Sequence, residues 1–162
     1  MAMNLRSRVK KFLSSLESIQ DELLELYERK RHAITRAEAT QMRTLAQTEA
    51  ELTQTMQRFV VQRQEILNDA GGAQLPCDSI LELVAVVGGD EQSQLEDRVK
   101  RSRKKSERIR RESWVHWVVS QRALNHYRDL LDLIADHGRK SPTYNHGSSR
   151  QSTGGAILDA SV

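Results

Sequence analysis

The chain has 162 residues, of which 29% are charged, 38% are hydrophobic and only 4% are aromatic. This length suits one domain, and the composition is typical of helix-rich or partly disordered proteins rather than compact enzymes. The net charge of +3 gives no global field for nucleic acid, so that function would need a local basic patch.

The first 70 residues predict a long helical region. No glycine precedes Gly71 and no proline precedes Pro76. Apolar residues recur every three or four positions over residues 9–33 and again over 42–66, which is the pattern of helices that pack on other helices. Between the two runs, Thr35-Arg36-Ala37-Glu38 matches a capping box and predicts the start of the second helix there.

Glycines divide the rest of the chain. After the break at residues 70–76, Asp78 or Ser79 is expected to cap a short apolar helix that ends at Gly88-Gly89. Residues 90–136 contain neither glycine nor proline and predict a third long helix. We therefore expect an all-α fold, an antiparallel bundle of three long helices with one short accessory helix, over residues 1–137. The Ser- and Gly-rich residues 138–162 predict a disordered tail.

The expected compartment is the cytoplasm. Cys77 is the one cysteine and cannot form an internal disulfide, which favours a reducing environment. The first 20 residues lack the apolar run of a signal peptide. No stretch approaches the roughly 20 apolar residues of a transmembrane span, so membrane insertion is not expected.

No pattern in the sequence predicts an enzyme, a metal site or a cofactor. The five histidines show no HExxH spacing, and no second cysteine is present to complete a zinc site. The Gly-Gly pairs are not followed by the Lys-Ser/Thr of a phosphate loop. No nucleophile has a base and an orienting group at a recognisable spacing.

Residues 98–111, RVKRSRKKSERIRR, form the strongest charge feature, with nine Lys or Arg. One interpretation is a basic helix that contacts phosphates, with Arg103, Lys104 and Lys105 at its centre. The favoured interpretation is a solvated face that balances acidic residues of the first helix, over residues 17–25. For the function of the whole chain, two alternatives stay open: a helical protein that binds nucleic acid through segment 98–111, and a structural coiled-coil protein.

Trp114 and Trp117 lie three residues apart in the third long helix. They are expected either in the core at the end of the bundle or on an apolar surface that receives a partner helix. The apolar residues from Val118 to Ile134 cover a wide arc for one helix, which favours a groove for a guest helix.

The arrangement resembles the FlgN family of flagellar export chaperones. The resemblance spans most of the chain and is most specific over residues 114–147, where a helix with a tryptophan precedes a Pro-Thr-Tyr tail. The matching residues are Trp117, Gln121, Asn125, Leu131, Pro142, Thr143, Tyr144 and Gly147.

The resemblance implies a cytoplasmic helical chaperone that binds the C-terminal region of the unassembled hook-associated proteins FlgK and FlgL. It further implies delivery to the flagellar type III export gate, where Tyr144 would dock on the cytoplasmic domain of FlhA. The basic segment 98–111 departs from the family pattern and leaves room for an electrostatic contact with the export ATPase or the gate. The implied substrate contacts are Trp117, Gln121, Leu124, Asn125, Leu131 and Ile134.

Overall fold

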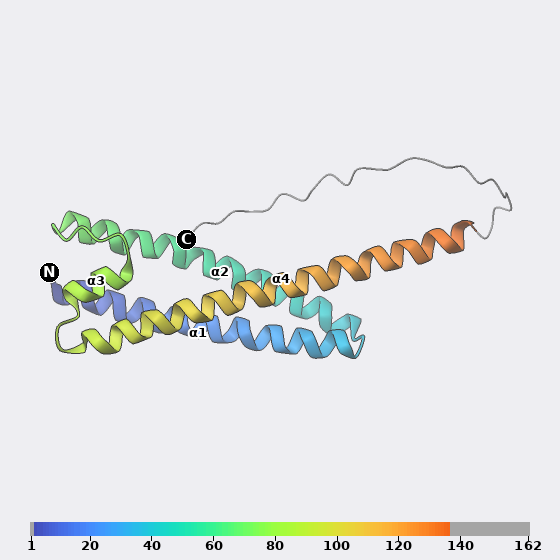
Figure 1. The fold of residues 1–162 in the computed structure, drawn as a ribbon, viewed down its shortest axis with the longest axis horizontal. Coiled ribbons are helices and arrows are strands. Elements are labelled where there is room, and N and C mark those ends of the chain that lie inside the picture. The colour runs from blue at the N-terminus through green and yellow to red at the C-terminus, as the bar shows by residue number, and fades with distance from the viewer. Residues whose placement is uncertain (1, 137–162) are drawn as a thin grey trace. The chain divides into compact units, whose positions relative to one another are not determined.

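The structure is a computed structural model that describes residues 2–136, and among these it contains helices and no strand (Figure 1). The predicted all-α class is confirmed. No helix in residues 2–136 is long and apolar enough to cross a bilayer. The chain divides into two units, residues 1–123 and 124–162. The helices are α1 (Ala2–Thr35), α2 (Ala39–Gly72), α3 (Ile80–Val87) and α4 (Gln92–Asp136), with a 3-10 turn at Gly89–Glu91 before α4.

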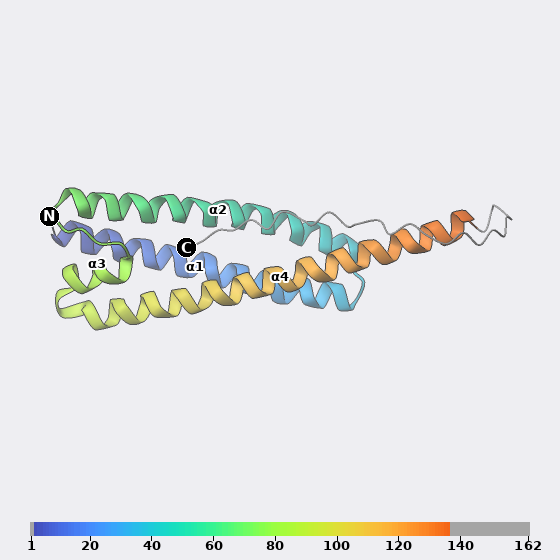
Figure 2. The same ribbon diagram turned by 45° about the horizontal axis from the view of Figure 1, so that its top comes forward.

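Within residues 1–123, α1 is the common partner of the other helices. Figures 1 and 2 show α2 running back along α1 and the first part of α4 lying beside α1 in the same direction. One apolar cluster joins the N-terminal half of α1 to the end of α2, to α3 and to the start of α4. A second cluster joins the C-terminal half of α1 to the start of α2, with Ile109 of α4 packed against it.

The predicted three-helix bundle is not confirmed along its whole length. His116 is the last buried side chain on α4 among the described residues. The predicted tail boundary at residue 138, the tail itself and Tyr144 lie outside the described residues.

The predicted capping box at the start of the second helix is wrong. Helix α1 continues to Thr35, whose hydroxyl donates to the carbonyl of His32 in its own helix at 2.8 Å. The N-cap of α2 is Glu38, with no side-chain cap bond. The turn is closed by the backbone instead: the N–H of Glu38 donates to the Ala33 carbonyl, and Ala37 takes a left-handed conformation with φ of 53°.

The cap predicted for the short helix is confirmed at Ser79. Its hydroxyl accepts a hydrogen bond from the Glu82 N–H at 3.2 Å, while the Glu82 carboxylate accepts from the Asp78 N–H at 2.9 Å. These bonds satisfy N–H groups that the first turn of a helix leaves without a backbone partner. Helix α3 can therefore begin abruptly and bury Leu83 and Val84 against α1 and α2.

Candidate functional site

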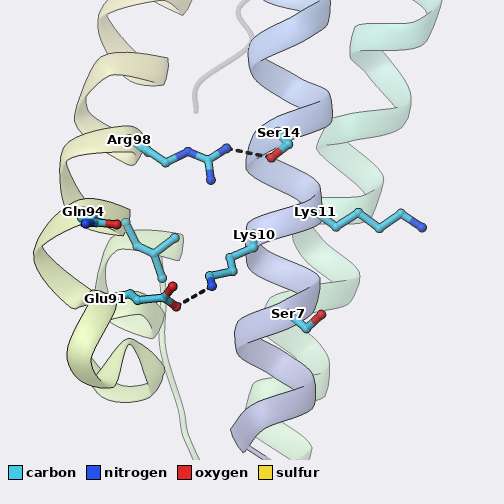
Figure 3. A pocket seen from close by; sticks show the side chains of 8 residues that line it. Ser7, Lys10, Lys11, Ser14, Glu91, Gln94 and Arg98 are labelled. Carbon is cyan, nitrogen blue, oxygen red and sulfur yellow. Dashed lines mark hydrogen bonds and ion pairs between the residues drawn. The ribbon is translucent and has the colours of Figure 1, made fainter.

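A polar groove between α1 and α4 is formed by side chains that already bind one another. Figure 3 shows Lys10 reaching Glu91, while Arg98 donates to Ser14 at 2.9 Å. The hydrogen bond from Lys10 lowers the pKa of the Glu91 carboxyl. Since these charges are matched, the groove acts as a polar contact between helices. Residues 2–136 hold no group of three or more His, Cys, Asp or Glu that could bind a metal ion.

Several cations of segment 98–111 face α1 and pair with its acidic residues. Arg98 binds Glu17 at 2.9 Å, and Lys105 binds Asp21 at 2.6 Å. The Arg108–Glu28 pair is longer, at 3.5 Å. Two of the acidic partners, Glu17 and Asp21, lie in the predicted range 17–25. On this side of the segment, the cations therefore balance acidic residues of α1, as predicted. The Arg108–Glu28 pair is exposed on both sides, and such pairs contribute about 0.2–1 kcal/mol.

The other side of the segment faces away from α1 and keeps its charge. Lys104, Arg110 and Arg111 lie on this side and have no acidic partner within residues 2–136. Successive helical residues are about 100° apart. The predicted patch of residues 103–105 is therefore spread around the helix: Arg103 lies near Glu107 at 3.7 Å, Lys104 is unpaired and Lys105 faces α1.

Trp114 and Trp117 are exposed on α4 rather than packed in the core. Their exposed fractions are 60% and 52%. The two rings stack on each other, with centroids 5.1 Å apart and an interplanar angle of 25°. Val115 and Val119 are also exposed on this part of α4. Of the two predicted locations for the tryptophans, the structure shows the apolar surface. Gln121 is also exposed.

The described part of the second unit, residues 124–136, continues as helix and exposes its apolar side chains. The four residues Leu124, Tyr127, Leu131 and Ile134 are spaced by three or four positions, so they share one helical face. Their exposed fractions run from 52% to 71%. Asn125 is exposed but lies about 120° around the helix from Leu131, so the predicted substrate contacts do not form a single face.

Two buried polar groups on α1 were not predicted. The first is Gln20, which is fully buried. Its amide donates to the Ser102 carbonyl at 2.9 Å and to the Ser106 hydroxyl at 2.8 Å, and its oxygen accepts from the Ser102 hydroxyl at 3.1 Å. The sequence signal for this contact was the presence of serines at apolar-repeat positions of α4. A polar side chain buried between two helices requires a polar partner on the facing helix.

The second group surrounds Lys30, whose ammonium binds Glu49 at 2.5 Å and lies 5.8 Å from the centre of the Tyr27 ring. His116 stacks on that ring, and its Nε2 lies 3.2 Å from the Tyr27 carbonyl oxygen. Since a carbonyl only accepts, Nε2 carries the proton, and the buried Nδ1 has no partner. Burial lowers the pKa of His116, and the nearby Lys30 lowers it further. Burial also raises the pKa of Tyr27 to about 12.

The comparisons with known proteins give one match. A family model described as FlgN protein matches residues 1–152. No curated protein and no solved structure matches the chain. The family match extends over both units.

Proposed function

The chain belongs to the FlgN family of flagellar export chaperones, and on that premise we propose that it binds the C-terminal region of unassembled FlgK and FlgL. In this proposal it acts in the cytoplasm, keeps these proteins unassembled and delivers them to the flagellar type III export gate. The observation that supports substrate binding most directly is the exposed apolar face of residues 124–134.

That face has the chemistry of a helix-binding surface. A chaperone needs apolar side chains that are available before the substrate arrives, and a guest helix contacts a host through residues spaced by three and four positions. Covering a half-exposed leucine-sized side chain contributes roughly 1 kcal/mol. The face formed by Leu124, Tyr127, Leu131 and Ile134 would contribute about 4–6 kcal/mol, compared with about 8 kcal/mol for a micromolar complex. Trp117, Gln121 and Asn125 complete the proposed contact set.

The proposed gate contact is Tyr144, which would dock on the cytoplasmic domain of FlhA. A tyrosine offers a large apolar ring and a hydroxyl that can bind at the bottom of a pocket. The surrounding sequence is poor in residues that build a core, so ordering it on the gate would cost free energy and keep the contact reversible. Delivery followed by release requires such a contact.

The substrate surface is tested by calorimetric titration of the full chain with the purified C-terminal segment of a hook-associated protein. Leu131→Asp should weaken binding by about 10–100-fold, because it removes apolar contact and requires a carboxylate to lose water. The matched control is Val61→Asp on α2, since Leu131 and Val61 are 65% and 60% exposed. If both substitutions weaken binding equally, or neither does, the proposed surface is wrong.

The gate contact is tested separately with Tyr144→Ala. This variant should bind the hook-associated segment as the wild type does and should lose binding to the purified cytoplasmic domain of FlhA. Unchanged binding to that domain would refute the role of Tyr144 and leave the substrate surface untouched.

A further inference from the structure

Apart from Trp117, the residues on the outer face of α4 over 100–119, the side away from α1, have no function in the proposal above. The N-terminal part of this face presents Lys104, Arg110 and Arg111, which have no acidic partner within residues 2–136. Its C-terminal part presents the stacked tryptophans, with Val115 beside Trp114. At 1.5 Å per residue the face is about 30 Å long. We call it the outer α4 face.

We propose that the outer α4 face binds the surface of an anionic phospholipid bilayer. Cationic side chains next to exposed tryptophans and aliphatic residues are the combination with which helices lie in a membrane interface. The cations are attracted to anionic headgroups, and indole rings favour the boundary between headgroups and acyl chains. This is peripheral binding, which does not require a membrane-spanning helix.

The geometry favours a bilayer over a second copy of the chain or a nucleic acid. A second copy would place the same cations against one another. A nucleic acid would use tryptophan faces for base stacking, but Trp114 and Trp117 already stack on each other at 5.1 Å. Val115 offers nothing to phosphates or bases, whereas the acyl boundary accepts it.

The chain contains a built-in probe for this test. Trp114 and Trp117 are its two tryptophans, so intrinsic tryptophan fluorescence reports on the outer α4 face alone. We expect the full chain to show a blue-shifted emission and to co-sediment with vesicles of phosphatidylcholine containing phosphatidylglycerol. Vesicles of pure phosphatidylcholine should produce neither effect, and added salt should weaken binding because it screens the headgroup charge. Absence of a shift with the anionic vesicles would overturn the proposal.

Two variants with the same change in net charge separate local from global electrostatics. Each cation near an anionic surface contributes about fivefold to binding, so Arg110→Glu with Arg111→Glu should weaken vesicle binding at least about 25-fold. The matched control is Arg43→Glu with Arg58→Glu, two exposed residues of α2. Equal loss in both double variants would overturn the proposal.

A third variant tests the aromatic part. Trp114→Ala should weaken vesicle binding and leave Trp117, which also belongs to the proposed substrate contacts, as the reporter.

A single-stranded oligonucleotide that binds more tightly than the vesicles and protects the face from them would replace this proposal with a nucleic-acid interface. Substrate binding measured by calorimetry is a separate readout, so failure of this proposal would leave the chaperone function intact.

Discussion

The buried Gln20 amide should fix how α4 is aligned along α1, and a double-mutant cycle can measure this. Gln20→Leu removes three hydrogen bonds to Ser102 and Ser106. At about 1 kcal/mol each they contribute about 3 kcal/mol, and the added apolar burial returns roughly 1 kcal/mol. We expect a net loss of about 2 kcal/mol, since the freed Ser102 hydroxyl can turn to a carbonyl of its own helix. Ser102→Ala should cost about 1–2 kcal/mol, because it leaves the buried Gln20 oxygen without its donor.

The combined variant is the decisive measurement. The double variant loses the hydrogen bond between Gln20 and the Ser102 hydroxyl only once, so Gln20→Leu with Ser102→Ala should cost about 2 kcal/mol, as Gln20→Leu does alone, rather than the additive loss of about 3–4 kcal/mol. Urea unfolding followed by circular dichroism gives the free energies, and the Gln20→Leu variant should melt about 4–8 °C lower. Additive losses in the double variant would refute the coupling. A wild-type stability in Gln20→Leu alone would show that the network contributes nothing.

The free energy of unfolding should fall as pH drops below 6.5, because the folded state lowers the pKa of His116 and the unfolded chain accepts the proton more readily. In thermal melts from pH 7.5 to 5, His116→Gln should reduce this loss. Phenolate absorbance at 295 nm should show one tyrosine that titrates near pH 12, and this step should be missing in Tyr27→Phe. The free energy of unfolding should fall as pH rises from 10 toward 12, because the unfolded chain releases the Tyr27 proton more readily. Gly88→Ala should destabilise by about 1–3 kcal/mol, since a Cβ would lie 2.5 Å from the Val84 carbonyl oxygen. Gly72→Ala, with nothing within 4 Å, should be neutral or slightly stabilising in the same melts.

Features set by local sequence were predictable. Gly71 and Gly88-Gly89 mark the ends of α2 and α3, and Ser79 is the cap that its hydroxyl and position predict. The turn at Ala37 was not predictable in the same way. A capping box requires only the right residue types at the right spacing, whereas in the structure α1 continues to Thr35 and α2 begins only at Ala39. The choice between the two depends on how α1 and α2 pack, which four residues do not encode.

The polar contacts between helices were the least predictable part of the site. Glu49 interrupts the apolar repeat of α2, and periodicity alone assigns it no partner, but it binds Lys30 across the interface between α1 and α2. Gln20 meets Ser102 more than 80 residues away. Side-chain pairs of this kind depend on the rotation and offset of two helices, which periodicity leaves undetermined. The exposure of Trp114 and Trp117 likewise depends on where α1 and α2 end beside them.

The parallel pairing of α1 with α4 also determines how the two helices respond to force. Glu17 meets Arg98, Asp21 meets Lys105 and Arg31 meets Glu112, so partners follow in the same order along both helices. A force that pulls the C-terminal end of α1 away from the adjacent part of α4 would therefore break the contacts one after another, beginning at His116, instead of shearing them together. Each exposed pair resists by less than about 1 kcal/mol. Stepwise peeling of α4 from α1 would thus need a far smaller force than sliding the two helices past each other.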